Sequence, residues 1–190
     1  MDFHTHDIHT PPGEGIVCLP QEVLLSPECW LDEEGYLPDA QRGAMYAAGI
    51  HPWWTAADDF DLEAHLAGLR RLLPLPEVVQ LGECGFDRLR GATIEQQCRV
   101  FEAQVELSEA FGVPMTLHCV RAYDVLLAEL RRLRPTQQWT VHGFRGKPAL
   151  ARQLLDAGLD LSFGPLRNEE SYALTPPERR HDETDASDQK

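Results

Sequence analysis

The sequence lacks the features that define two large classes of protein. Its five cysteines contain no CxxC pair, and an odd count does not make a complete disulfide framework. We therefore expect reduced thiols, most of them small core residues. No apolar run approaches the roughly 18 residues of a membrane helix, and the first ten residues show neither a basic segment nor an apolar signal core. These absences predict a cytoplasmic protein without a membrane partner.

Positive charge is also scarce. The chain has 17 Lys and Arg residues against 31 Asp and Glu residues, which gives a formal net charge of −14. This balance disfavours a broad basic surface for nucleic acid. A phosphate-containing substrate is not excluded, because divalent cations bound in a site invert the local field whatever the sign of the outer surface.

What the sequence does have, from about residue 43 onward, is an alternation of short apolar runs with amphipathic helical patterns. This alternation indicates βα units and a parallel sheet. One helix is expected to begin after Thr93, which forms a capping box with Gln96, and to end at Gly112. Seven runs are typical of strands and RRHDETD is a weaker eighth, the seven being DFHTH, GIVCL, MYAAGIH, VVQLG, PMTLH, WTVH and LDLSFG. The count predicts a small TIM-type (β/α) barrel.

We expect this barrel to be one incomplete domain, residues 1–190, with a polar C-terminal end at 176–190. Its length lies below the roughly 200-residue lower end of the (β/α)₈ range. Few residues follow Asp185, so the helix after the eighth strand is expected to be absent. Residues 25–42 show no regular pattern and predict a loop or an irregular crossover. A homo-oligomer covering the open side of the barrel is a further expectation.

His4 and His6 stand two residues apart at the end of the first expected strand, so both side chains point to the same side. This spacing is typical of metal ligands, although for a lone pair near an N-terminus surface or structural histidines are the more common explanation. Other candidates each end or follow an expected strand, or lie in the last one: Glu83, His118, His142 and Asp185. The carboxyl ends of parallel strands form one rim, which predicts that these residues converge on a metal site.

This set of side chains also restricts the identity of the metal ion. Imidazoles with carboxylates suit Zn, Mn, Fe or Ni, whereas Mg prefers more oxygen ligands. A single carboxylate such as Glu83 is able to bridge two ions. Two ions about 3.5 to 4 Å apart would activate water and stabilise both the attacking and the leaving oxygen of a displacement.

Seven segments together resemble the TatD family of metal-dependent hydrolases: DFHTH, GIHPWW, LGECGFD, LHCVRAYD, VHGFRGK, LSFG and ETDAS. They follow the order of the family and span nearly the whole chain. The resemblance implies a TIM barrel of the metal-dependent hydrolase superfamily with one to three divalent ions, two being expected, and deoxyribonuclease activity. The family's longer members continue past the ETD segment with a loop and a helix.

The resemblance also implies roles for individual residues. One ion would be held by His4, His6, Glu83 and Asp185, and a second by Glu83, His118 and His142. Besides Glu83, the catalytic candidates are Asp185, which would help to activate the attacking water, and His51, which corresponds to a histidine near the substrate phosphate. The alternative for His51 is a residue that shapes the loop beside Pro52.

Three residues are candidates for substrate binding. Arg121 and Arg145 follow ligand histidines at a distance of three residues, where a guanidinium can clamp a phosphate by bidentate hydrogen bonds. A solvent-facing arginine is the ordinary alternative for each. Trp53, beside Trp54, offers an aromatic face on which a base can stack, with core packing as the alternative.

The sequence therefore predicts that water activated by metal ions attacks a phosphodiester in DNA or in a small molecule. The identity of the metal, among Zn, Mn, Mg, Fe and Ni, stays open. A hydrolase of small esters, amides, lactones or phosphoesters on the same barrel is one alternative, since a fold does not determine its substrate, and the acidic surface favours it mildly. A catalytically disabled binding protein is the other.

Overall fold

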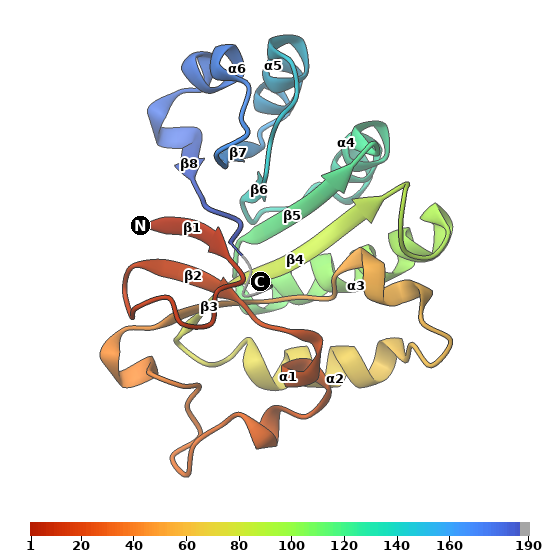
Figure 1. Cartoon of the computed structure of the whole chain (residues 1–190). Helices are drawn as coiled ribbons and strands as arrows, with labels where there is room; N and C mark the ends of the chain where they lie inside the picture. The colour runs from red at the N-terminus through yellow and green to blue at the C-terminus, as the bar shows by residue number, and fades with distance from the viewer. Residues whose placement is uncertain (187–190) are drawn as a thin grey trace.

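Eight parallel strands form one sheet in the computed structural model, which describes residues 1–186 (Figure 1). The strands pair in chain order, from β1 to β8. They are β1 (Asp2–Thr5), β2 (Gly15–Cys18), β3 (Met45–Ala48), β4 (Val78–Asp87), β5 (Met115–Val120), β6 (Trp139–Val141), β7 (Asp160–Phe163) and β8 (Arg180–Asp182). The predicted small TIM-type barrel is confirmed, including its weak eighth strand.

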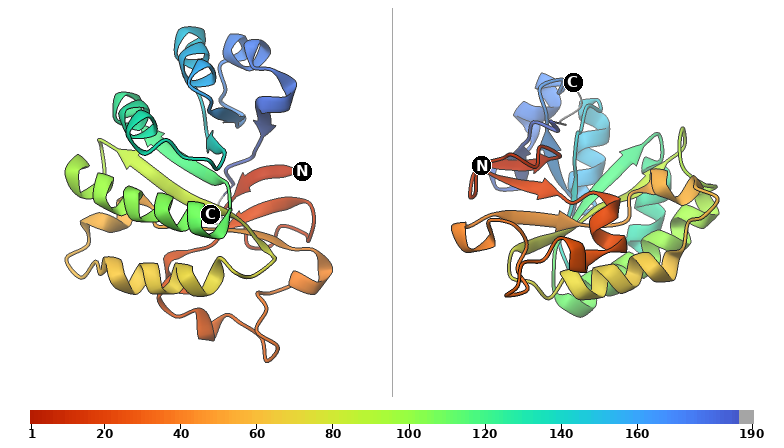
Figure 2. Two further views of the ribbon diagram at one scale, coloured as in Figure 1. Left: turned by 180° about the vertical axis from the view of Figure 1, so that it is seen from behind. Right: turned by 60° about the horizontal axis from the view of Figure 1, so that its bottom comes forward.

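Helices cover the outside of this sheet. Helices α2 and α3 lie beside β3 and β4, whereas α5 and α6 lie near β6 and β7 at the opposite end (Figures 1 and 2). The α-helices are α1 (Gln21–Leu25), α2 (Leu62–Leu72), α3 (Ile94–Phe111), α4 (Tyr123–Leu133), α5 (Pro148–Asp156) and α6 (Glu169–Leu174), and the 3₁₀ helices are η1 (Pro27–Cys29), η2 (Ala40–Arg42), η3 (Pro52–Ala56) and η4 (Pro177–Arg179). The sequence pattern missed α1 and α6, which are too short to show a helical period.

Helix α3 shows how local sequence sets an element. The Thr93 hydroxyl accepts the N–H of Gln96 at 3.3 Å, and the Gln96 side chain accepts the N–H of Thr93 at 3.3 Å, so the predicted capping box is confirmed. Gly112 ends the helix with a φ of 68°, a conformation that glycine adopts without strain. Between these ends, the Phe101 ring packs 4.7 Å from the ring of Phe86 in β4 and anchors the helix to the core.

Two connections depart from regular βα units. Residues 6–14 join β1 to β2 with turns and without a helix. Apart from Leu25, the last residue of α1, residues 25–42 contain only η1 and η2 between stretches of loop, which confirms the expected irregular crossover.

The barrel closes through the backbone of residues 184–186, and β1 and β8 form no ladder with each other within the described chain. The N–H of Asp185 donates to the carbonyl of His4 at 3.1 Å, and the N–H of His6 donates to the carbonyl of Ala186 at 2.7 Å. We name this connection the seam. In Figure 1 the chain that leaves β8 passes beside β1 at this place.

Several strand ends differ from the sequence expectation: β5 continues two residues past His118, to Val120, and β3 ends at Ala48, before His51. Asp185 was expected within the eighth strand, but β8 ends at Asp182, and the chain takes a φ of 50° at Asp185 before it reaches β1. Strand β4 was expected to end just before Glu83, yet it continues to Asp87, because residues 84–87 keep pairing with β5. Glu83 therefore lies inside a strand.

Three further expectations concern thiols, membranes and the last helix. Cys18, Cys84 and Cys119 are buried, as expected of small core residues, and all five cysteines are free. Among residues 1–186, no helix is both long and apolar enough to cross a membrane. The expected absence of a final helix concerns residues 187–190, which lie outside the described residues.

Candidate metal centre at the barrel mouth

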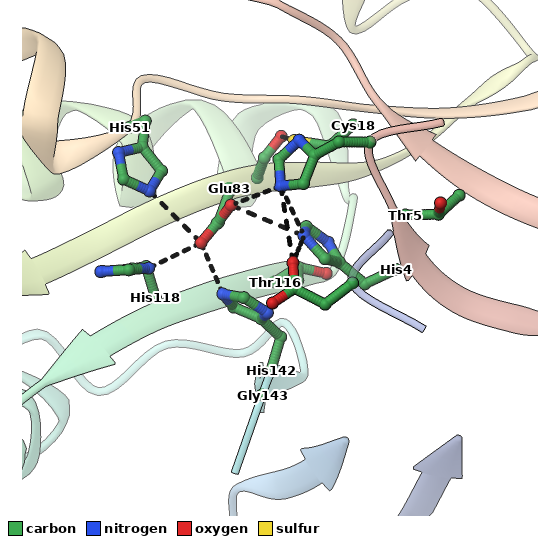
Figure 3. A network of polar contacts seen from close by, with 12 residues as sticks. His4, Thr5, Cys18, His51, Glu83, Thr116, His118, His142 and Gly143 are labelled. Atoms are coloured by element: carbon green, nitrogen blue, oxygen red, sulfur yellow. Dashed lines mark hydrogen bonds and ion pairs between the residues drawn. The ribbon is translucent and has the colours of Figure 1, made fainter. Parts of the chain in front are cut away.

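Glu83 lies at the centre of a ring of histidines from separate strands (Figure 3). Its side chain is buried, and its Oε1 atom faces three rings at once. That atom is 2.5 Å from His142 Nε2, 2.7 Å from His118 Nδ1 and 3.3 Å from His51 Nε2. His142 follows β6, His118 lies within β5 two residues before its end, and His51 lies three residues after β3, so the parallel sheet brings them to one rim.

The other oxygen of Glu83 faces the N-terminal histidines. Oε2 is 3.3 Å from His6 Nε2 and 3.5 Å from His4 Nε2, and the two Nε2 atoms are 3.3 Å apart. The spacing of two residues does place both rings on the same side. Asp185 Oδ1 lies 3.8 Å from His6 and 3.9 Å from His4, and its side chain is 35% exposed. All six residues predicted to hold metal are thus brought together.

The cluster favours positive charge next to Glu83. Burial raises the pKa of Glu83, but the charge of His142 and hydrogen bonds from neighbouring histidines outweigh this and hold it well below its usual range. Burial lowers the pKa of His142, yet Glu83 and Glu183 raise it well above its usual value. A carboxylate with imidazoles at such distances is therefore ionised and needs compensating charge.

The donor atoms fit divalent cations. Nitrogen and oxygen atoms 2.5 to 3.5 Å apart have the separation of ligands that share an ion at about 2.0 to 2.2 Å. Within the described residues, His4 Nδ1 and Glu183 Oε2 are also buried without a hydrogen-bond partner. Three groups have donor atoms within 4.8 Å of one another, namely His4, His6, Cys18 and Glu83; His4, His142 and Asp185; and His51, Glu83 and His118. The first group shares His4 with the second and Glu83 with the third, as expected if a carboxylate bridges neighbouring ions. The membership of these groups differs from the two ligand sets that the resemblance implies.

For His51, a hydrogen bond from the backbone indicates which ring nitrogen carries the proton. Its Nδ1 accepts the backbone N–H of Trp53 at 3.1 Å, so the neutral ring carries its proton on Nε2. That nitrogen faces Glu83. His51 thus presents a hydrogen-bond donor to the centre, which agrees with a place beside a substrate phosphate.

Sequence reasoning missed two buried carboxylates of this site. Asp87 Oδ2 lies 3.1 Å from His118 Nε2. Glu183 Oε1 lies 3.5 Å from His142 Nδ1 and accepts the N–H of Gly143 at 2.6 Å. The sequence signal for Asp87 was strand periodicity, because it follows Glu83 by four residues on one strand and so points to the same side. Glu183, just after β8, had no such signal. Cys18, which belongs to one donor group, carried no such signal.

A cavity of about 640 Å³ opens over the centre and is lined by Glu83, His118, Trp53 and Trp54 among others. Trp53 is 43% exposed, and its indole N–H donates to Asp87 Oδ2 at 2.6 Å. The guanidinium of Arg90 lies 4.3 Å from the centre of the Trp53 ring and covers one of its faces.

The two candidate phosphate clamps stand apart from the cluster. Arg121 and Arg145 are exposed, and neither lines the cavity. Arg121 has a φ of 52°, and its carbonyl accepts a hydrogen bond from Arg88 at 2.9 Å. Phosphate binding by either guanidinium stays a prediction.

Fold and centre together define a class: parallel β/α barrels with a histidine and carboxylate cluster at the carboxyl ends of the strands. The sequence profile described as TatD related DNase matches residues 28–188, and the chain belongs to the TatD family. The matched range begins after His4 and His6, whose place in the centre rests on the distances given above.

Curated relatives agree with this assignment. The chain is 40% identical over 118 residues to a protein of Erwinia billingiae named 3'-5' ssDNA/RNA exonuclease TatD, covering 61% of this chain and 44% of that protein. It is 34% identical over 169 residues to a protein of the same name from Erwinia amylovora, covering 82% and 64%. The chain therefore spans about half to two thirds of the length of these relatives.

Solved structures share the fold. YJJV, a TatD homologue from Escherichia coli K12, superposes with a TM-score of 0.72 at 24% identity, covering 97% of this chain and 78% of that one. A TatD family hydrolase from Entamoeba histolytica has a TM-score of 0.68 at 20% identity, covering 90% and 60%.

Proposed function

We propose that this chain is a metal-dependent hydrolase that cleaves phosphodiester bonds of single-stranded nucleic acid, DNA above all. The observation that carries the proposal is the ionised Glu83 carboxylate at the barrel mouth, faced by five histidines within 3.5 Å. The names of the curated relatives, which are 3'-5' exonucleases of ssDNA and RNA, support this choice of substrate.

The metal ions would be held as the family resemblance implies, one by His4, His6, Glu83 and Asp185 and one by Glu83, His118 and His142. One to three ions of Zn, Mn, Mg, Fe or Ni are compatible with these ligands, and two are proposed. Such ions polarise a phosphoryl group and make a nearby water more acidic.

The residues of the chain then have separate roles. Asp185 would take a proton from the attacking water, and its partly exposed side chain at the cavity supports this role. His51, with its N–H toward the centre, is placed to donate to a phosphate oxygen or to the leaving oxygen. Trp53 offers its uncovered face to a base, and Arg121 and Arg145 would contact phosphates outside the cavity.

One observation favours a second candidate function. None of the residues that line the cavity in the described part of the chain is Lys or Arg, and the formal net charge is −14. Long polyanions gain little from such a surface. A small phosphoester that occupies only the cavity is therefore the alternative substrate.

The variant Glu83→Gln tests the proposal, with Glu106→Gln on the exposed side of α3 as a control for the lost charge. Metal content is measured by elemental analysis, and hydrolysis by nucleotide release from a single-stranded oligonucleotide and by a chromogenic phosphodiester, with Mn²⁺ or Mg²⁺. We expect Glu83→Gln to lose metal and both activities, and Glu106→Gln to keep them. Undiminished metal content and hydrolysis in Glu83→Gln would refute the proposal.

The same assay separates the alternatives. Hydrolysis of the oligonucleotide by the unmodified protein supports the nuclease, and hydrolysis of the chromogenic ester alone supports the small-phosphoester hydrolase. Retained metal without hydrolysis of either substrate supports the binding protein. A single domain, a cytoplasmic location and a homo-oligomer that covers the open side of the barrel also stay proposals, and light scattering tests the last of them.

A further inference from the structure

The cavity over the metal centre has a second wall, formed by residues that belong to none of the donor groups. These residues are Leu19, Pro20, Gln21 and Glu22, which follow β2, and Trp53 and Trp54 in η3. Four of the six side chains are apolar or aromatic, a surface that suits a flat ring better than a phosphate. Gln21 adds an amide, which carries both a hydrogen-bond donor and an acceptor.

The backbone of Gln21 is held in place by the packing of α1 on α2. Val23 and Leu24 of α1 are buried. A Cβ atom at Gly68 of α2 would lie 1.8 Å from the carbonyl oxygen of Leu24, so only glycine allows the two helices to approach this closely. Gln21 is the first residue of α1 and is partly buried, so the core determines where its side chain starts.

His65 of α2 determines which way the Gln21 amide faces. The ring is buried, and its Nδ1 lies 2.6 Å from the carbonyl oxygen of Asp61. A carbonyl oxygen only accepts, so Nδ1 carries a proton and donates it. Nε2 lies 2.9 Å from the amide nitrogen of Gln21, which only donates, so Nε2 accepts. Both contacts require the same tautomer of the ring.

The opposite orientation of the amide lacks support. It would turn Oε1 of Gln21 toward Nε2 of His65 and would require a second proton on the ring. No carboxylate forms an ion pair with His65 within residues 1–186, so nothing there balances the added charge. Aromatic neighbours also enclose the ring, with centroid distances of 4.9 Å to Phe60 and 6.3 Å to Trp54. His65 thus supports two residues of the wall, Gln21 and Trp54.

The amide therefore offers its remaining donor and acceptor in a set order. One hydrogen of its nitrogen is bonded to His65, and Oε1 forms no hydrogen bond within the part of the chain that the structure describes. An amide that rotates freely exchanges its donor and acceptor and pairs with the edge of any base. An amide held by a histidine leaves an unmatched base with an unpaired polar group, which weakens the binding of that base.

We propose that Gln21 is a specificity-determining residue that reads the edge of a nucleobase in the cavity, and that His65 is a positioning residue that sets the order of its donor and acceptor. This inference rests on the proposed function, because it places the base of a nucleotide against the second wall while the phosphate lies at the metal centre. Trp53 and Trp54 would contact the face of the base, and Gln21 its edge.

Nucleotide binding tests the role of Gln21 without any hydrolysis. Calorimetry with Mn²⁺ present compares the four deoxynucleoside 5'-monophosphates with inorganic phosphate, which has no base. In the unmodified protein we expect one nucleotide to bind about 3- to 10-fold more tightly than the weakest, the effect of about one neutral hydrogen bond. Gln21→Met keeps the length of the side chain but removes the amide, so it should bind all four alike and keep its affinity for phosphate. Gln153→Met, at an exposed position of α5, is the control and should keep the preference.

A second pair of variants separates orientation from packing. His65→Phe removes the acceptor of the Gln21 amide but keeps a ring, so the amide can rotate and the preference among the nucleotides should be lost. Phe60→Leu removes an aromatic neighbour of His65 and leaves the hydrogen bond to Gln21, so it should keep the preference. A preference that survives in His65→Phe would overturn the positioning role.

Equal affinities for the four nucleotides in the unmodified protein would overturn the proposal, and so would a preference that Gln21→Met retains. If His65→Phe does not fold, long-range ¹H–¹⁵N spectra of the unmodified protein decide its role, since the Nδ1–H form of His65 supports it and the Nε2–H form overturns it. If the protein hydrolyses neither an oligonucleotide nor a chromogenic phosphodiester, the proposed function fails, whereas the nucleotide affinities still decide the role of Gln21.

Discussion

The two sides of Glu83 are built differently. On the Oε1 side, which we name the interior half, His118 and His142 come from neighbouring strands inside the sheet. Each has a carboxylate behind its ring, Asp87 for the first and Glu183 for the second. The backbone of both residues is bonded to a neighbouring strand, and Asp87 lies within hydrogen-bond distance of His118 Nε2, whereas Glu183 contacts His142 Nδ1 only as an ion-pair neighbour at 3.5 Å.

The residues on the Oε2 side of Glu83, which we name the seam half, are held by fewer contacts. His4 and His6 belong to the first strand and the residue after it, and Asp185 reaches them from the other end of the chain. The side chains of His6 and Asp185 are 37% and 35% exposed, whereas those of His118 and His142 are only 10% and 8% exposed. The comparison teaches that a site shared by many strands is preorganised mainly where the sheet is continuous. Four predictions test it, from the largest expected effect to the smallest.

The largest difference is expected in the packing around each half. Phe86 in β4 is fully buried, so Phe86→Ala should lower the free energy of unfolding by about 3 to 5 kcal/mol. Phe3 in β1 is half-buried and stacks on His181 at 4.2 Å, so Phe3→Ala should cost only about 1 kcal/mol. Urea unfolding measures both values. Equal losses would show that the seam is as tightly packed as the interior.

The next effect concerns the carboxylate behind His142. Glu183→Gln keeps an oxygen for the N–H of Gly143 but weakens the orientation of the ring. We expect metal to bind about 10- to 100-fold more weakly, measured by calorimetric titration. Glu178→Gln on the exposed 3₁₀ helix η4 is the matched control and should bind normally. An unchanged affinity in Glu183→Gln would show that Glu183 does not support metal binding in the interior half.

The seam has its own hydrogen bonds to break. Asp2 Oδ1 accepts the N–H of Thr184 at 3.0 Å, and Oδ2 accepts the Thr184 hydroxyl at 2.5 Å. Asp2→Asn loses an acceptor there and should lower the free energy of unfolding by about 1 kcal/mol.

Hydrogen exchange locates this loss. The amides of His6 and Asp185, which bridge the seam, should exchange faster in Asp2→Asn, whereas amides between β4 and β5 should not. Faster exchange throughout the sheet would mean that the seam and the interior open together.

The smallest effect is a dependence on pH where β7 meets β8. Burial raises the pKa of Asp160, but hydrogen bonds from His181 and Arg179 outweigh this and hold it below its usual value of 3.8. The unfolded chain therefore binds the proton more readily, so this stabilisation is present above the usual pKa and is lost as pH falls through the folded value. The partly exposed pair with Arg179 should contribute on the order of 0.5 kcal/mol.

Asp160→Asn measures this contribution. The difference in unfolding free energy between the unmodified protein and the variant should shrink as pH falls from about 5 to about 2, as expected for a carboxyl group with a lowered pKa. Asp156→Asn on the exposed face of α5 is the control and should give a difference that does not change with pH. A constant difference for Asp160→Asn as well would contradict a lowered pKa of Asp160 in the folded protein.

Local sequence was enough to predict a helix or strand where that element contains its own capping residues or apolar pattern. The capping pair of Thr93 and Gln96, with Gly112 at the other end, located α3 to the residue. Apolar runs located β2 to β7, because a strand buried on both faces reads as a continuous apolar segment, whereas β1 and β8 contain few or no apolar residues and are only partly buried. The predicted ends of β4, β5 and β8 were wrong, since pairing between β4 and β5 and the route of the chain from β8 to β1 decide them.

In the candidate site, too, some features were predictable from local sequence and others depend on tertiary contacts. His4 and His6 were paired by spacing alone, and the remaining candidates by their place at strand ends, and the structure brings all of them to Glu83. Asp87 was overlooked because its partner, His118, lies on another strand. Arg121 and Arg145 stand outside the cavity, which spacing along the chain does not reveal.

The sequence by itself determined the order of strands, the barrel and the residue types gathered at its mouth, because periodicity and strand ends are local properties of the chain. Only the tertiary structure decided which atoms meet. The seam, the two carboxylates behind the histidines and the nitrogen that each ring turns toward Glu83 depend on contacts between residues far apart in sequence. Such contacts exist only after the sheet has set the register of its strands.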